Sequence, residues 1–294
     1  MTHDDLATSL TVDSPQPVDV VARQVKEIST LPQVALKVIE VAKDPDAGAA
    51  NLKAVVEGDP ALSARVLRIV NSASCGMRST VTNLHQAISY LGFSQVRNLA
   101  MTASVSEIFK KDEQVGSYCR SALWRHLVSV GICARMVASR SRIPDFEDAF
   151  LAGLLHDIGI IIEDQRVHAR FCEMIGNLRE GISLSASEQE WLGFDHCLLG
   201  ERIAEAWGFP PTVRAAIRFH HASQLYEGED ADIVCCVEIA NVICTLKGIT
   251  SVGRRLVEPP LDASQALGFQ KDDFVILATD LDRELELNEN LFEL

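Results

Sequence analysis

An adjacent histidine and aspartate, His156 and Asp157, interrupt an apolar run between Asp148 and Ile162. Apolar residues occupy nearly every face of this segment, a pattern that predicts a helix buried in the middle of a helical protein. Because an unpaired buried carboxylate costs several kcal/mol, Asp157 needs a hydrogen bond, an ion pair or a metal ion. A backbone partner for His156 and an arginine for Asp157 would satisfy the pair without any ligand.

Four further histidines favour a metal site. His126, His196, His220 and His221 lie in other segments with helical patterns. Together with the doublet they supply the imidazoles and the carboxylate that divalent transition metals use. We therefore expect a bound iron, manganese or zinc ion, with a role as core histidines as the alternative for His196 and His220.

The composition of the 294-residue chain is typical of a soluble globular protein. A hydrophobic fraction of 47% allows one large core or two modest ones. No apolar stretch reaches the roughly 20 residues that a membrane helix needs, and the N-terminus lacks a signal-peptide pattern. Most of the eight cysteines lie in apolar patterns without metal-binding CxxC spacing, which indicates reduced thiols and a cytoplasmic location.

The formal net charge of -14 argues against nucleic acid as a partner. A surface of this charge repels the phosphate backbone, although a local basic pocket remains compatible with it. We expect neither a nucleic-acid nor a membrane partner.

Apolar residues at helical spacing predict an all-α fold in two parts. Residues 1–19 are expected to be a disordered lead-in, residues 20–110 an N-terminal helical bundle, and residues 111–294 a second helical domain. In the second domain the predicted helices include 117–139 with His126, 146–163 with the doublet, and 166–180 with His168 on the surface. In the first, Asp59 and Pro60 suit the N-cap and the first position of a helix.

The doublet and its surroundings resemble the HD superfamily of metal-dependent phosphohydrolases, and residues 24–225 resemble its HDOD branch. The resemblance rests on Leu31-Pro32, Asp59-Pro-Ala-Leu-Ser63, Asn71-Ser-Ala-Ser74, Ala87-Ile-Ser-Tyr-Leu-Gly92, Trp124-Arg-His126, Gly153-Leu-Leu-His-Asp-Ile-Gly159, Asp195-His196, Ala206-Trp-Gly-Phe-Pro210 and His220-His221. It implies an N-terminal bundle packed on an HD-like domain, and a signalling module without demonstrated catalysis that acts through protein partners.

The resemblance also assigns metal ligands. His126, His156 and Asp157 match the first three, and His196 and His220 match extra ligands of the two-metal HD-GYP phosphodiesterases. We expect the doublet to project from one continuous helix, on which neighbouring side chains diverge by about 100 degrees. His221 would then point away from its neighbour and orient a ligand rather than bind the metal.

The position of the last family aspartate is taken by Asn241, whose neutral amide is a weaker ligand. Glu238, one turn earlier, either restores the missing charge or faces solvent or an arginine. Arg125, Arg214 and Arg218 are candidates for contact with a phosphate, with pairing to surface acids as the alternative.

Two further catalytic features of HD-GYP proteins are missing. Ile160 replaces their lysine, and no GYP loop follows His221. These departures favour a non-catalytic signalling or scaffold module with a degenerate metal site. The alternatives are a phosphodiesterase or phosphohydrolase that acts on a nucleotide or cyclic dinucleotide, in which Asp157 would be catalytic, and a pseudoenzyme that senses such a ligand.

Overall fold

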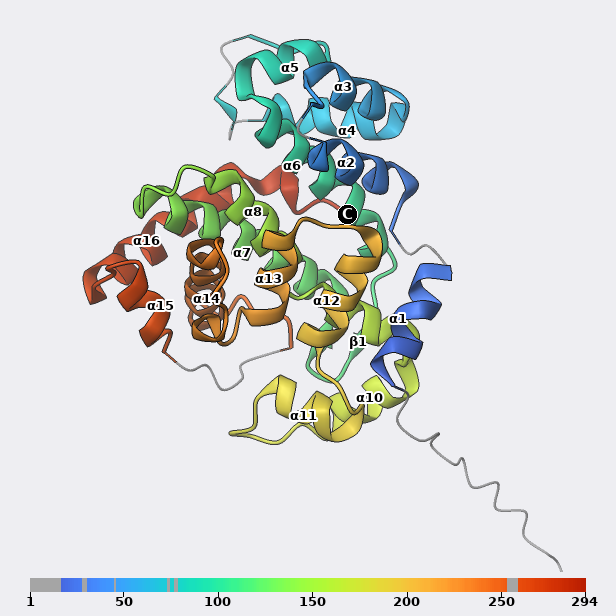
Figure 1. The fold of residues 1–294 in the computed structure, drawn as a ribbon, viewed down its shortest axis with the longest axis vertical. Coiled ribbons are helices and arrows are strands. Elements are labelled where there is room, and N and C mark those ends of the chain that lie inside the picture. The colour runs from blue at the N-terminus through green and yellow to red at the C-terminus, as the bar shows by residue number, and fades with distance from the viewer. Residues whose placement is uncertain (1–16, 28–30, 45, 73–74, 77–78, 253–258) are drawn as a thin grey trace, which may run out of the picture.

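Helices α7 (Arg120–Arg140) and α8 (Phe146–Leu155) form the centre of the fold (Figure 1). The computed structural model describes residues 17–27, 31–44, 46–72, 75–76, 79–252 and 259–294. Gly153 of α8 lies so close to α7 that a Cβ atom there would come within 2.9 Å of the Gly131 Cα. Helix α14 (Ala231–Leu246) packs against both. This buried three-helix layer supports the histidines described below.

The N-terminal helices form a bundle at one end of the molecule (Figure 1). They are α2 (Gln33–Lys43), α3 (Ala49–Glu57), α4 (Pro60–Val70), α5 (Leu84–Leu91) and α6 (Phe93–Val105), followed by the 3-10 turn η2 (Ser106–Phe109). The Asp59 carboxylate accepts hydrogen bonds from the backbone at the start of α4, which confirms the predicted cap. The bundle meets the rest of the protein where α6 packs on α8.

Helix α1 (Val18–Glu27) packs against α12 (His196–Trp207) and α9 (Ile158–Arg166) in the other half of the molecule. It begins two residues before the predicted start of the bundle at residue 20. The rest of the predicted lead-in, apart from residue 17, lies outside the described residues. The domain boundaries near residues 19 and 110 remain predictions.

The second half is helical apart from one short hairpin, so the predicted all-α class is confirmed for the described residues. Its remaining elements are β1 (Gln114–Val115), β2 (Tyr118–Cys119), α10 (His168–Gly176), α11 (Leu184–Trp191), α13 (Pro211–Phe219), η3 (Ser223–Leu225), α15 (Leu261–Ala266), α16 (Lys271–Leu287) and η4 (Glu289–Leu291). The strands pair antiparallel, with Gln114 opposite Cys119. The predicted helix 117–139 therefore begins later, at Arg120.

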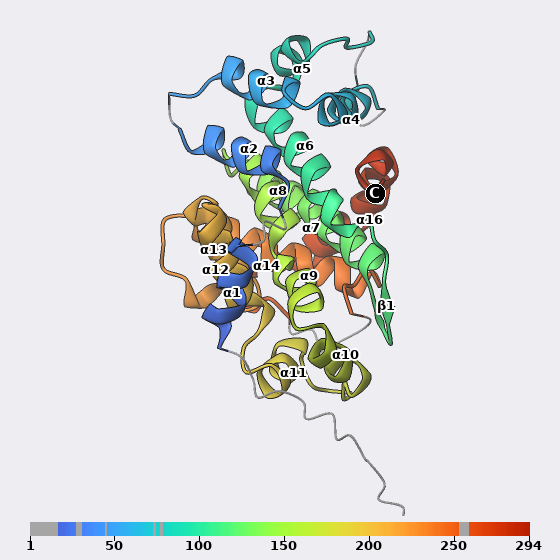
Figure 2. The same ribbon diagram turned by 90° about the vertical axis from the view of Figure 1, so that its right-hand side faces the viewer.

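The prediction of one continuous helix over 146–163 is wrong. The helix is interrupted at His156 and Asp157, between the end of α8 and the start of α9. At Asp157 the backbone has φ -101° and ψ 18°. Two residues later, a Cβ atom on Gly159 would lie 2.0 Å from the carbonyl oxygen of His196. The break turns α9 against the start of α12 and places the doublet in the junction. Figure 2 shows α8 and α9 following one another through the molecule.

None of the helices in the described residues is both long and apolar enough to cross a membrane.

Candidate metal centre

The Asp157 carboxylate lies among four imidazole rings. One belongs to the neighbouring His156, and the other three come from distant parts of the chain. Its Oδ2 is 3.5 Å from Nε2 of His126 and 3.4 Å from Nε2 of His156. Its Oδ1 is 3.3 Å from Nε2 of His196 and 3.2 Å from Nε2 of His220. All five side chains are buried. The structure thus brings together five of the six residues that were predicted as ligands, from α7, the α8–α9 junction, α12 and the end of α13.

Each of the four rings is held through its other nitrogen, Nδ1. The contacts are His126 to the Ile249 carbonyl at 2.9 Å, His156 to the Gly153 carbonyl at 2.7 Å, His220 to the Ile217 carbonyl at 3.0 Å, and His196 to Glu188 Oε2 at 2.6 Å. Carbonyl and carboxylate oxygens accept hydrogen bonds, so each Nδ1 donates. Every neutral ring therefore points an Nε2 lone pair at Asp157.

The protonation states of these side chains leave too few N–H donors for hydrogen bonds to the Asp157 carboxylate. Burial lowers the pKa of His156 to about 4, so the ring is neutral near pH 7. Burial alone would raise the pKa of Asp157, but the facing imidazoles, His156 first, hold it well below its usual range. The pKa of His196 is raised well above its usual value despite burial, because Cys197 and Glu188 lie beside it. With Nδ1 bonded to the Gly153 carbonyl, the neutral His156 ring has no hydrogen to donate to the carboxylate.

Three atoms of this group still have no hydrogen-bond partner: Oδ1 of Asp157 and Nε2 of His156 and His220. Unsatisfied buried polar atoms are costly, and bound cations would satisfy all three. Ligands of a tetrahedral metal at the usual 2.0–2.1 Å lie about 3.3 Å from one another. The observed spacings of 3.2 to 3.5 Å agree with that value. The donor set therefore fits a divalent transition metal.

The ligands fall into two groups on opposite oxygens of Asp157. The first half-site consists of His126, His156 and Oδ2, and the second contains His196, His220 and Oδ1. His221 joins the second half-site, since its Nε2 lies 3.2 Å from Nε2 of His196. The prediction that His221 points away from its neighbour is wrong, because the ring centroids of His220 and His221 are 4.0 Å apart. Helix α13 ends at Phe219, so the helical divergence of neighbouring side chains does not apply there.

A cavity of about 450 Å³ opens over the cluster. Apart from the histidines and Asp157, the residues that line it are Ser183, Leu184, Ser185, Gln224, Glu238, Asn241, Val242, Thr245, Thr250, Ser251, Val252, Pro259, Leu261 and Asp262. Asn241 is buried, and its Oδ1 accepts a hydrogen bond from Thr245 at 3.4 Å. Glu238 Oε2 accepts one from the Ser223 backbone at 3.0 Å. Both predicted residues thus reach the cavity, and each already has a protein partner.

The three arginines predicted as phosphate contacts pair elsewhere. Arg125 stacks on the ring of Phe292, at 5.2 Å from its centroid. Arg214 lies 3.2 Å from a Glu205 carboxylate oxygen. Arg218 contacts Asp195 at 3.8 Å and Glu201 at 3.6 Å. None of them is among the residues that line the cavity. Acidic neighbours account for the positions of Arg214 and Arg218, and an aromatic ring for that of Arg125.

Sequence reasoning missed two buried glutamates behind the second half-site. Glu188 Oε2 accepts hydrogen bonds from both the backbone nitrogen and Nδ1 of His196, which fixes the ring. Burial and the neighbouring Glu188 raise the pKa of Glu163 well above its usual value. Glu188 lies eight residues before His196 in a polar helix, and no motif in that helix distinguishes it from its neighbours.

His168 has an exposed side chain, as expected for a surface histidine, but it belongs to an ion-pair network. Its Nδ1 lies 3.0 Å from Asp164 Oδ1, and its Nε2 lies 3.2 Å from Glu113. Arg120 and Tyr118 also bind the Asp164 carboxylate. Because Arg120 already neutralises these carboxylates, the network needs no metal. It joins the hairpin to α9.

Comparisons with known proteins identify the family and the fold of the chain. A family model of the HDOD domain matches residues 28–223. An HDOD domain protein of unknown function from Geobacter sulfurreducens has a similar fold, with a TM-score of 0.76 and 24% identity, covering 93% of this chain and 97% of that one. A protein of Marinobacter aquaeolei VT8, provisionally named a signal transduction protein, has a TM-score of 0.74 and 25% identity, covering 96% of this chain and 63% of that one.

An uncharacterised protein of Treponema pallidum (strain Nichols) is 24% identical over 228 residues, or 76% of this chain. The match spans 43% of that relative, so it is less than half of the longer protein.

Proposed function

This chain belongs to the HDOD domain family, and we propose that it is a non-catalytic signalling module whose HD-like half is held together by a divalent metal centre. The observation that carries the proposal is the buried Asp157 carboxylate facing four Nε2 atoms, where Oδ1 of Asp157 and Nε2 of His156 and His220 lack a hydrogen-bond partner. His126, His156, Asp157, His196, His220 and His221 would hold the metal, which is iron, manganese or zinc. The centre would join segments that are up to 95 residues apart, from His126 in the first half-site to His221 in the second.

The surroundings of the centre support a role without hydrolysis. A bound divalent metal can activate a water molecule, but phosphate transfer also needs cations that neutralise the substrate. Ile160 is fully buried, and no arginine or lysine occurs among the described residues that line the cavity. Asn241 contributes a neutral amide at the cavity wall. We expect the module to act in the cytoplasm through contacts with other signalling proteins.

The test has two measurements on the full chain purified without chelator. Elemental analysis should find iron, manganese or zinc, and each bound metal should raise the melting temperature. A content below about a tenth of an equivalent, with no thermal gain on adding these metals, would contradict the metal centre. Cyclic dinucleotides and phosphomonoesters should remain intact in the presence of metal. Multiple turnover that disappears in His156→Ala would instead establish an enzyme.

A second function is favoured by the cavity itself. Its 450 Å³ is within the range of small-molecule sites, and it reaches the candidate ligands. It would suit a sensor that binds a nucleotide or cyclic dinucleotide without cleaving it. Equilibrium dialysis of cyclic dinucleotides against the metal-loaded protein distinguishes the two: binding without turnover supports the sensor, and no binding supports the scaffold.

A further inference from the structure

The second half-site contains a thiol that the family resemblance does not assign. Cys197 follows His196 at the start of α12, and its side chain is buried. Its Sγ lies 3.4 Å from Nε2 of His196. The donor atoms of His196, Cys197, His220 and His221 all lie within 4.8 Å of one another. A cation bound by the three imidazoles would therefore have a sulfur atom within its reach.

We infer that Cys197 is a metal ligand and that the second half-site binds a thiophilic divalent cation of the zinc class. This inference rests on the proposed metal centre and adds to it the identity of one ligand and the preference of one half-site.

A hydrogen-bonded core cysteine does not account for the geometry. Nε2 of His196 lies 3.4 Å from the Cys197 Sγ, 3.2 Å from Nε2 of His221 and 3.3 Å from Oδ1 of Asp157. Nε2 of a histidine makes one good hydrogen bond, as donor or as acceptor, and Nδ1 of the same ring already donates to Glu188. Three close polar neighbours at one nitrogen are instead the pattern of ligands around a shared cation.

The spacing agrees with mixed nitrogen and sulfur ligation. With metal–nitrogen bonds near 2.05 Å and a metal–sulfur bond near 2.3 Å, tetrahedral ligands lie about 3.3 Å apart for nitrogen pairs and about 3.5 Å apart for nitrogen and sulfur. The observed separations are 3.2 Å for the nitrogen pair and 3.4 Å for nitrogen and sulfur. The unpartnered Nε2 of His220, whose residue is 1% exposed, faces the same group.

Charge gives an independent reason for a thiolate. Asp157 supplies one negative charge to both half-sites, and Asn241 supplies none. On binding, the Sγ–H bond of Cys197 breaks, the proton leaves to solvent, and a sulfur lone pair forms the bond to the cation without any redox change. The thiolate then adds the second negative charge. The first half-site consists of two imidazoles and a carboxylate oxygen, without a sulfur ligand. The second half-site therefore has the softer ligand set and should prefer softer metal ions.

Cobalt(II) is the probe, because a cobalt–thiolate bond has a charge-transfer band in the near ultraviolet that imidazole and carboxylate ligands lack. Titration of chelator-treated full-length protein with cobalt should develop this band as the second half-site fills. Cys197→Ser should bind cobalt with visible d–d bands and no charge-transfer band, and Cys197→Ala should do the same. Zinc should abolish the wild-type band at a concentration where manganese leaves it intact.

Cys172→Ser is the matched control, because Cys172 Sγ also lies 3.4 Å from a histidine nitrogen, Nε2 of His168 in the ion-pair network around Asp164. The band should persist in this variant. Cobalt binding without the band, or a band that survives in Cys197→Ser and disappears in Cys172→Ser, overturns the inference while leaving the metal centre standing. Failure to bind cobalt at all overturns the proposed metal centre itself.

Discussion

Replacing Asp157 with alanine removes the carboxylate that both half-sites share. In the metal-loaded protein the substitution leaves four inward-facing imidazoles without their common anionic partner. Breaking a buried charge pair by deleting one partner costs about 3 to 5 kcal/mol. We expect Asp157→Ala to lower the free energy of unfolding by an amount in this range, although the substitution removes little apolar surface.

The metal dependence of that loss is the sharper prediction. A metal present at about a thousand times its Kd stabilises the fold by about 4 kcal/mol when the unfolded chain does not bind it. Wild-type protein should show this increment between chelator and excess metal, and Asp157→Ala should show under about 1 kcal/mol of it. Urea denaturation followed by tryptophan fluorescence measures both, since Trp124 is buried two residues before His126.

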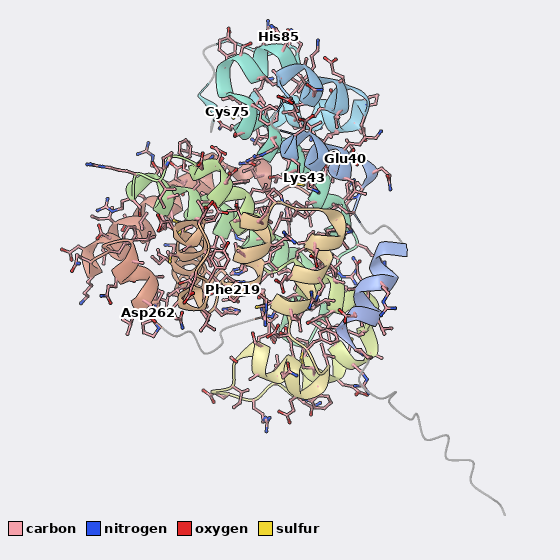
Figure 3. All side chains as sticks on the ribbon, viewed as in Figure 1. Glu40, Lys43, Cys75, His85, Phe219 and Asp262 are labelled. Atoms are coloured by element: carbon pink, nitrogen blue, oxygen red, sulfur yellow. The ribbon has the colours of Figure 1, made fainter. Side chains whose placement is uncertain are left out.

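Two further variants test the reasoning. His85 is an exposed residue of α5, far from the centre (Figure 3). His85→Ala should lower the free energy of unfolding by under about 0.5 kcal/mol and keep the full stabilisation by metal. His168 is a poorer control because it pairs with Asp164. Asp157→Asn keeps the size of the side chain, so loss of the metal increment there isolates the charge. If Asp157→Ala unfolds at the wild-type midpoint and yet loses signalling, the site is functional rather than structural.

Two more predictions follow from the neighbours of the centre. Glu188→Gln should weaken metal binding by about 10- to 100-fold in isothermal titration, because it removes the charge that orients His196, whereas Glu190→Gln on the same helix should not. Without metal, stability should fall as the pH drops from about 6.5 toward 4: His156 stays neutral in the fold while the unfolded chain takes up its proton. The wild-type loss is about 3 kcal/mol at most, and a His156→Gln variant with an equally steep profile would contradict this assignment.

The features that sequence predicted correctly are those set by neighbouring residues. The predicted cap at Asp59 accepts bonds from backbone atoms two and three residues later, at the start of α4. Asn83 and Asp195 cap α5 and α12 through the same kind of bond. Such caps depend on local chemistry, so their positions can be derived without knowing what packs against the helix. The family resemblance then supplied the candidate ligand positions that local chemistry could not.

What sequence missed depends on contacts between distant segments. The helix break at the doublet depends on the approach of Gly159 to the His196 backbone, which no local pattern encodes. Glu188 becomes a partner of His196 only when α11 folds back onto α12. His221 turns toward the centre because α13 ends before it. In each case tertiary packing determined the direction of a side chain after the local rule had been applied.

The same packing gives helix α8 two distinct attachments. In its first turn, the Arg97 guanidinium donates to Asp148 at 2.7 Å, and the Asn98 amide donates to the Glu147 carbonyl at 2.7 Å, which fixes the helix to α6 of the bundle. At its other end, His156 faces Asp157. Ten residues of helix span about 15 Å, and an α-helix transmits displacement along its axis with little compression. The contacts with the bundle and the junction that carries His156 and Asp157 therefore lie at opposite ends of one helix.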